Sequence, residues 1–174
     1  MKNVAVKKII GAIIGVVLVI AVYAIIDGSA EKDLMGTWAY TYEFEYYEGT
    51  ELEVTEYLEF ADGTYRWYMD REITKTALLK NYDEYLTLNE ITEEDVIASG
   101  YESIEDCKAQ WLEEDLKELV DEYNEEGGAG TWQISNGTFL FIENGTSTEY
   151  KTDYRLEDDT LYLQTDGITL TKVK

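Results

Sequence analysis

The chain has 174 residues and a formal charge of −23 at pH 7, and it contains neither histidine nor proline. The absence of histidine excludes the Ser-His-Asp and Cys-His catalytic arrangements and the common zinc sites, and the excess of acid makes nucleic acid and anionic lipid unsuitable partners. Fifteen tyrosines and four tryptophans supply the apolar surface that an acidic disordered tail lacks. The composition therefore indicates one globular domain with an appendage.

The first expected element is one transmembrane helix over residues 9–26, an uncharged run of 18 residues rich in Ile and Val. As a helix this run measures about 27 Å, close to the thickness of the hydrocarbon core of a bilayer. A basic tail at residues 1–8 precedes it, and a short acidic tether at residues 27–33 follows it. The positive-inside rule then predicts a single-pass protein of the cell membrane, with a cytoplasmic amino terminus and an extracytoplasmic domain.

A cleaved signal peptide is the alternative interpretation of this segment. Gly28, Ser29 and Ala30 offer the small residues of a cleavage site. The apolar run is longer than the usual hydrophobic region of a signal peptide, which spans about 7 to 15 residues. An uncleaved anchor is therefore the favoured interpretation.

From residue 34 onward the pattern is that of β-strands. Residues 38–46 carry an aromatic side chain at every second position, which places five rings on one face of a strand. Two further strands are expected on either side of an Asp-Gly hairpin signal, at residues 51–60 and 64–70. These three strands predict an antiparallel meander.

Helix signals replace strand signals in an insertion over residues 71–128. The clearest amphipathic pattern begins at an N-cap signal at Ser103, carries Trp111 and Leu116 on one apolar stripe, and ends at Gly127. Because such a stripe has to be buried, the last helix is expected to pack on the β-structure.

Strand signals return at residue 130 with a second Gly-Thr-Trp, and Asn-Gly and Asp-Gly dipeptides separate further short strands. Counting both halves gives eight short strands, which predict a mainly β domain over residues 34–174. The expected architecture is an up-and-down antiparallel barrel or a sandwich, with the helices inserted between strands 3 and 4. On a barrel, the last helix would either cover the open end as a lid or lie along the outer wall.

Four motifs punctuate the predicted strands: Leu-Met-Gly-Thr-Trp at 34–38, Leu-Glu-Phe-Ala-Asp-Gly-Thr-Tyr at 58–65, Gly-Thr-Trp at 130–132, and Tyr-Arg-Leu with Asp-Thr-Leu between 154 and 161. Together they resemble the bacterial lipocalin-like domains of cell-envelope proteins. The resemblance leaves out the anchor and the helical insertion. It implies an eight-stranded lipocalin-like barrel whose cavity can hold an apolar or aromatic ligand, and it lends no catalytic residue.

The candidate ligand-binding residues are aromatic side chains expected to face the interior, together with one acid. The rings could offer stacking faces and hydroxyl groups to a ligand. An eight-stranded barrel is also narrow enough for such side chains to fill it as plain core. The candidates are Trp38, Tyr40, Tyr42, Glu56, Tyr65, Trp67, Tyr150 and Tyr154.

Glu56 differs from the other candidates because it shares a strand face with four apolar residues, where an unpaired carboxylate is costly to bury. One interpretation places it inside the cavity, where it orients a ligand or a cation. The other places it near the barrel rim or pairs it with a base such as Lys172. Both interpretations stay open at the level of sequence.

Nothing in the sequence indicates a cofactor or a metal. Cys107 is a lone thiol on an apolar stripe and is expected to be a small core residue. The acid clusters at residues 93–95, 113–115 and 121–126 lack the spacing of an EF-hand loop and are expected to be solvated helix surface. No pair of carboxylates is placed for catalysis, so an enzyme is not expected.

The expected function is a membrane-anchored extracytoplasmic binding or sensing module for a small apolar or aromatic ligand. The alternative is a solid-core interaction or structural domain that presents an acidic helical face to a protein partner. Only the first of these requires a cavity in the barrel.

Overall fold

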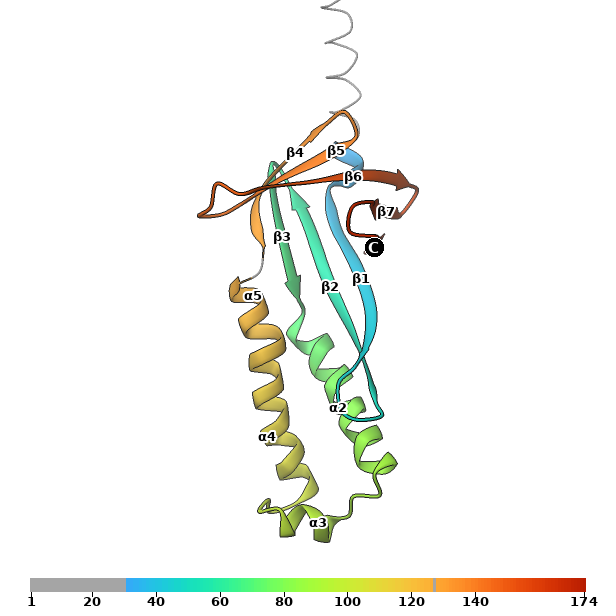
Figure 1. Cartoon of the computed structure of the whole chain (residues 1–174), viewed down its shortest axis with the longest axis vertical. Helices are drawn as coiled ribbons and strands as arrows, with labels where there is room; N and C mark the ends of the chain where they lie inside the picture. The colour runs from blue at the N-terminus through green and yellow to red at the C-terminus, as the bar shows by residue number, and fades with distance from the viewer. Residues whose placement is uncertain (1–30, 127) are drawn as a thin grey trace, which may run out of the picture.

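The computed structural model describes residues 31–126 and 128–174, and its eight strands form one closed antiparallel barrel (Figure 1). Each strand pairs with its neighbours in sequence, and β1 closes the barrel on β8. The up-and-down barrel is thereby confirmed over the sandwich. The strands are β1 (Gly36–Glu45), β2 (Glu51–Ala61), β3 (Thr64–Met69), β4 (Ala129–Ser135), β5 (Thr138–Glu143), β6 (Glu149–Glu157), β7 (Thr160–Leu163) and β8 (Ile168–Lys172).

The predicted transmembrane helix at residues 9–26 lies outside the described residues, as do the basic tail and the first part of the tether. Among the described residues, none of the helices combines the length and the apolar character that crossing a membrane requires. Residues 31–34 are helical and lead into β1, and the last of them, Leu34, is completely buried. The end of the tether is therefore part of the folded domain.

The helices lie between β3 and β4, as expected from the sequence. Asp70 caps the first by accepting hydrogen bonds from the backbone N–H groups of Glu72 and Ile73, and Ser103 caps the third. A π-helical segment continues the third helix, so the chain stays helical until it approaches β4. The elements are α2 (Arg71–Leu88), α3 (Glu93–Ala98), α4 (Ile104–Leu116), η1 (Lys117–Glu122) and α5 (Tyr123–Glu126).

Strands β1 and β2 are longer than the barrel, and their register is continuous over ten residue pairs. In the described chain, β8 pairs with β1 only at Trp38 and Ala39, and β3 pairs with β2 only from Glu56 onward. Residues 40–45 of β1 and 51–55 of β2 therefore project from the barrel as a two-stranded ribbon, which we call the hairpin extension (Figure 1).

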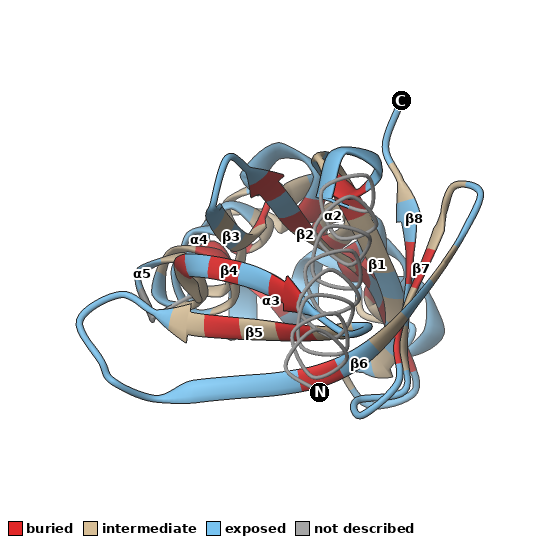
Figure 2. Cartoon of the chain, turned by 90° about the horizontal axis from the view of Figure 1, so that it is seen from above, coloured by how far each residue is buried: buried red, intermediate tan, exposed pale blue. Residues whose placement is uncertain are grey.

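The apolar interior is divided into two clusters. The barrel core surrounds Trp38, Phe139 and Leu161, all completely buried, and along β4 and β5 buried residues alternate with more exposed ones (Figure 2). The second cluster, the hairpin–helix core, lies between the inner face of the hairpin extension and the helices. Its buried members are Leu52, Val54, Met69, Leu78, Tyr82, Leu116 and Val120.

The predicted last helix corresponds to α4, η1 and α5, and its α4 part takes neither of the two expected positions. It packs on α2 and contributes Leu116 to the hairpin–helix core, beside the barrel's open end and its wall rather than on them (Figure 1). The physical reason is that the hairpin extension offers its own apolar face, which a ribbon of two strands cannot bury by itself. At the end of the helical segment, α5 does reach the barrel and contacts β3.

Helix α2 also covers one edge of the hairpin extension. The amide nitrogen of Asn81, which is 2% exposed, donates a hydrogen bond of 3.1 Å to the backbone carbonyl of Glu51. Its amide oxygen accepts a bond of 3.3 Å from the hydroxyl of Thr50. Because an uncovered strand edge carries unpaired backbone groups, this contact protects β2 where β3 no longer does.

Candidate functional site

The barrel is closed at the end where the chain enters it. The indole N–H of Trp38 donates a hydrogen bond of 2.7 Å to the carbonyl of Leu34, and that of Trp132 donates one of 3.0 Å to the carbonyl of Ala61. Gly130 permits the second Gly-Thr-Trp to lie against β5, because a Cβ at this position would be 2.0 Å from the carbonyl oxygen of Ile142. Both Gly-Thr-Trp motifs therefore help to close this end of the barrel with packed side chains.

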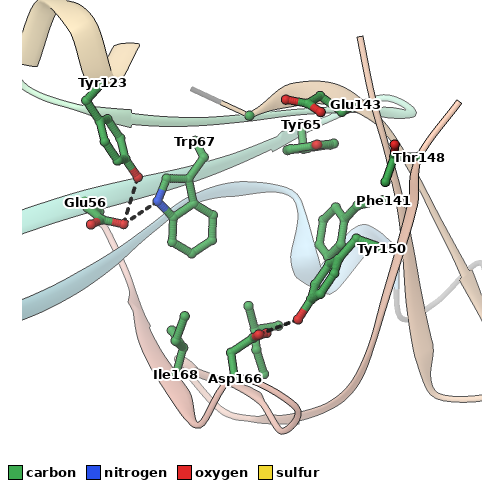
Figure 3. Close-up of a pocket in the computed structure, with 12 residues that line it drawn as sticks. Glu56, Tyr65, Trp67, Tyr123, Phe141, Glu143, Thr148, Tyr150, Asp166 and Ile168 are labelled. Carbon is green, nitrogen blue, oxygen red and sulfur yellow. Dashed lines mark hydrogen bonds between the residues drawn. The ribbon is translucent and has the colours of Figure 1, made fainter. Parts of the chain in front are cut away.

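A pocket of about 610 Å³ opens at the other end of the barrel, where the β5–β6 and β7–β8 connections face α5 (Figure 3). Its volume lies within the range of about 300–1,000 Å³ that is typical of small-molecule sites. The twelve residues that line it are Glu56, Tyr65, Trp67, Tyr123, Gly128, Phe141, Glu143, Thr148, Tyr150, Leu163, Asp166 and Ile168.

Aromatic rings form most of the pocket wall. The rings of Tyr65 and Phe141 meet edge to face with centroids 4.9 Å apart, and Tyr150 lies nearly parallel to Phe141 at 6.3 Å. Trp67 and Tyr123 extend the wall toward the helices (Figure 3). Such contacts hold the rings in place, so the pocket has aromatic faces even when it is empty.

Glu56 lies where the pocket meets the hairpin–helix core and accepts three hydrogen bonds. The hydroxyl of Tyr42 donates to one carboxylate oxygen at 2.7 Å. The hydroxyl of Tyr123 at 2.9 Å and the indole N–H of Trp67 donate to the other (Figure 3). A carboxylate that is half-buried without a basic partner is stabilised in this way, because every donor is aimed at it.

Burial and the neighbouring carboxylate keep the phenols neutral. Burial, followed by the hydrogen bond and the charge of Glu56, raises the pKa of Tyr42 far above its ordinary value. Burial and then the charge of Glu56 raise the pKa of Tyr123 similarly. The arrangement recurs in the hairpin–helix core, where Asp115 accepts a bond of 2.6 Å from Tyr82 and burial is again the largest cause of the raised pKa of that tyrosine.

Two more carboxylates stand at the pocket rim. Asp166 accepts a hydrogen bond from the hydroxyl of Tyr150, and burial together with this bond raises the pKa of Tyr150 to about 12. Glu143 ends β5 and is exposed. None of the twelve lining residues is basic. In the part of the chain that the structure describes, no three carboxylate or thiol groups converge to hold a metal ion.

Four of the eight predicted site residues line this pocket: Glu56, Tyr65, Trp67 and Tyr150. Tyr42 reaches it indirectly, through its bond to Glu56. The remaining three belong to the barrel core, because Trp38 is completely buried at the closed end and Tyr40 and Tyr154 pack against that cluster.

The suggested pairing of Glu56 with Lys172 is wrong. The ammonium group of Lys172 donates a hydrogen bond of 2.6 Å to the carbonyl of Asp33 and lies 5.0 Å from the ring centroid of Trp38. It therefore sits at the closed end of the barrel, whereas Glu56 sits at the open end.

Sequence reasoning did not assign Tyr123, Phe141, Glu143 or Asp166 to the site. Tyr123 belongs to a helical stripe that was interpreted as core, and the two acids lie at strand ends or turns. The useful signal is topological: in an up-and-down barrel every second connection lies at the same end, so turn residues at 143–148 and 164–167 meet there.

Comparison with protein-family models, with curated proteins and with solved structures finds no match to this chain. The chemistry of the pocket therefore has to be inferred from its own residues. Those residues combine aromatic faces with carboxylates.

Replacing Glu56 by Gln is expected to destabilise the domain by about 1–3 kcal/mol, because the glutamine NH₂ group would oppose at least one donor that the carboxylate now satisfies. Urea unfolding of the full chain measures this loss. Glu59→Gln is the matched control: Glu59 is exposed on the same strand, opposite Arg66, and should cost less than about 1 kcal/mol. Equal losses for the two variants would contradict the role given to Glu56.

The raised tyrosine pKa values predict alkaline unfolding. A tyrosine in an unfolded chain ionises near pH 10, whereas burial raises the pKa of Tyr42, Tyr82, Tyr123 and Tyr150 in the fold. The stability that the neutral, buried tyrosines contribute to the fold is therefore fully present below about pH 10, and it is lost as the pH rises through their raised pKa values. Tyrosinate absorbance should lag behind that of free tyrosine and rise together with the loss of near-UV circular dichroism. Complete titration of all fifteen tyrosines near pH 10 in a folded chain would disprove this.

Proposed function

We propose that this protein is an extracytoplasmic binding or sensing module whose barrel mouth takes a small ligand with an apolar or aromatic body and a positive charge. The observation that carries the proposal is the pocket itself, in which five aromatic side chains and three carboxylates meet with no base. The proposal is one of binding rather than catalysis.

The body of the ligand follows from the aromatic walls. A flat or branched apolar group can lie against Trp67, Tyr65 and Phe141 and displace water from their faces. These faces carry negative electrostatic potential, so they also attract a cation placed within about 6 Å of a ring centroid. An ammonium or quaternary ammonium group is therefore a better match than a neutral polar group.

The charge of the ligand follows from the carboxylates. Both oxygens of Glu56 already accept hydrogen bonds, so this residue acts on a ligand through its charge. Glu143 and Asp166 at the rim add to the same negative potential. An anionic ligand would meet three like charges in a site that provides no cation, and such contacts disfavour binding strongly.

The resemblance to bacterial lipocalin-like domains supports the same function. An eight-stranded barrel is wide enough to hold one small ligand when its own side chains leave part of the interior free, and here they fill only the closed end. A fold does not determine function by itself, so the resemblance supports the pocket rather than replacing it. The alternative, a solid-core domain with an acidic helical face, does not account for the pocket at the barrel mouth.

Binding is expected to discriminate between two molecules of the same shape, phenyltrimethylammonium and tert-butylbenzene. The cation should bind at least about tenfold more tightly, which corresponds to about 1.4 kcal/mol. Fluorescence of the full chain reports binding, because Trp67 lines the pocket. Failure of both compounds to bind would overturn the proposed function, and equal binding would overturn its preference for cations.

The variant Glu143→Gln/Asp166→Asn tests the source of this preference. Removing two rim charges should lower the affinity for the cation several-fold and leave the affinity for tert-butylbenzene unchanged, because the aromatic walls are kept. Glu94→Gln/Glu114→Gln removes two exposed charges from α3 and α4, neither of which lines the pocket, and serves as the control. If the control weakens the cation equally, the effect comes from net charge alone.

We also propose that the domain is held outside the cell membrane by residues 9–26, since the apolar run and the preceding Lys2, Lys7 and Lys8 fit a cytoplasmic amino terminus. Protease added to intact cells should then digest the chain from residue 34 onward. Protection of this region, with digestion only after lysis, would refute the topology. A cleaved leader would instead leave a domain that salt or mild washing releases from the cells.

A further inference from the structure

We propose that the free edge of β1 in the hairpin extension, residues 41–45, is a docking site for an extended basic segment of another protein. The segment would add to β1 as a further strand, with lysine or arginine at alternate positions. This inference concerns a different surface from the pocket and does not depend on the proposed ligand.

Backbone hydrogen bonds at the two ends of β1 show which of its residues bond to β2 and which face away from it. The N–H of Tyr46 donates to the carbonyl of Thr50 at 3.2 Å, so even-numbered residues of β1 bond to β2. The N–H of Val173 donates to the carbonyl of Thr37 at 2.9 Å, so an odd-numbered residue bonds on the other side. In an antiparallel ladder these two orientations alternate along the strand.

The backbone groups of Thr41, Glu43 and Glu45 consequently face away from β2. β8 pairs with β1 no further than Ala39, and no other strand in the described residues pairs with β1 on this side. In Figure 1 β1 lies on the side of β2 away from β3 until the two strands cross in this view near the hairpin tip. The printed contacts of α2 and α4 are to the edge of β2 and to the inner face of the ribbon. The edge therefore presents three unpaired backbone N–H and C=O pairs to a partner strand.

The outer face of the hairpin extension is strongly acidic. Glu43 lies directly opposite Glu53, and Glu45 lies directly opposite Glu51. All four side chains are exposed, and like charges in such cross-strand pairs are destabilising. Lys80 of α2 is the one base lining the groove beside them. Lysine or arginine on the same face of an added strand would lie next to these pairs and offset their repulsion.

The inner face of the same strand specifies the alternate positions of the partner. Tyr40, Tyr42 and Phe44 point inward and are only half-buried, and they stack in a row with centroids 5.1 and 6.0 Å apart. Apolar residues between the basic ones would cover the exposed parts of these rings. The site thus fits an extended segment that alternates basic and apolar residues.

Charge also excludes the simplest other occupant, a second copy of this chain. Pairing the edge of β1 with the same edge of another copy would bring Glu43 and Glu45 against identical acids. A chain with a charge of −23 adds long-range repulsion to that contact. The occupant is therefore a different, basic protein segment.

The test uses the full chain in mild detergent and an eight-residue probe, acetyl-(Lys-Val)₄-amide. The probe should bind and should slow hydrogen exchange at the backbone amides of Thr41, Glu43 and Glu45. A peptide of equal composition with its four lysines in one block should bind at least about tenfold more weakly, because it cannot place all of its charges on one face. No binding at millimolar probe, or protection only at other amides, overturns the proposal.

Two variants separate strand addition from simple charge attraction. Thr41→Pro removes an N–H that faces the free edge and no backbone bond to β2, so it should weaken the alternating peptide at least tenfold without a change in charge. Thr41→Val is its control, because it removes only the hydroxyl contact of 2.9 Å with Thr55 and should bind the peptide normally. Glu43→Gln/Glu53→Gln should weaken it by a similar factor and reduce its salt dependence, and this variant is not expected to perturb folding. The Glu94→Gln/Glu114→Gln control should bind normally. Equal loss in that control would show attraction to net charge and would overturn the docking site.

Discussion

The hydrogen bonds to the carboxylate of Glu56 join the strands β1, β2 and β3 to the end of the helical insertion. Tyr42 reaches it from β1, Trp67 from β3 and Tyr123 from α5, while Glu56 itself lies on β2. A half-buried charge with no basic partner is tolerated only when its oxygens are fully hydrogen-bonded. The position of α5 at the barrel mouth is therefore tied to the chemistry of one side chain, and the pocket wall that Tyr123 and Trp67 form is a consequence of the same three bonds.

The helical insertion is explained by the length of the hairpin rather than by the barrel. The barrel buries its own core, but the hairpin extension leaves Leu52 and Val54 on a face that two strands cannot cover. α2 and α4 supply that cover through Leu78 and Leu116, and Asn81 protects the edge of β2. The insertion therefore begins directly after β3, where the chain leaves the barrel beside the face that needs burial.

Sequence patterns were sufficient to predict the strands and helices but not to predict which of them contact one another. A period of two, tight-turn dipeptides and N-cap signals located all eight strands and the helices, because these features are local. The position of α4 was not predicted because no local sequence signal shows that β1 and β2 extend beyond the barrel. Four of the twelve residues that line the pocket were among the predicted ones, including Glu56 and Trp67, since they lie at alternate strand positions that face inward. Tyr123 and Asp166 come from a helix end and a turn, and only the closed topology brings them together.

The acids of the hairpin extension have two separate physical effects. Glu43 and Glu45 lie on the uncovered edge of β1, where charged side chains prevent uncontrolled pairing with other strands. That explanation does not extend to Glu51 and Glu53, because they lie on β2, whose edge α2 covers through Asn81. These two acids increase the repulsion across the ribbon without protecting an edge. Positive charge on the outer face offsets a cost of this kind: Lys80 lines the groove beside these acids, and a basic partner strand on β1 would add more.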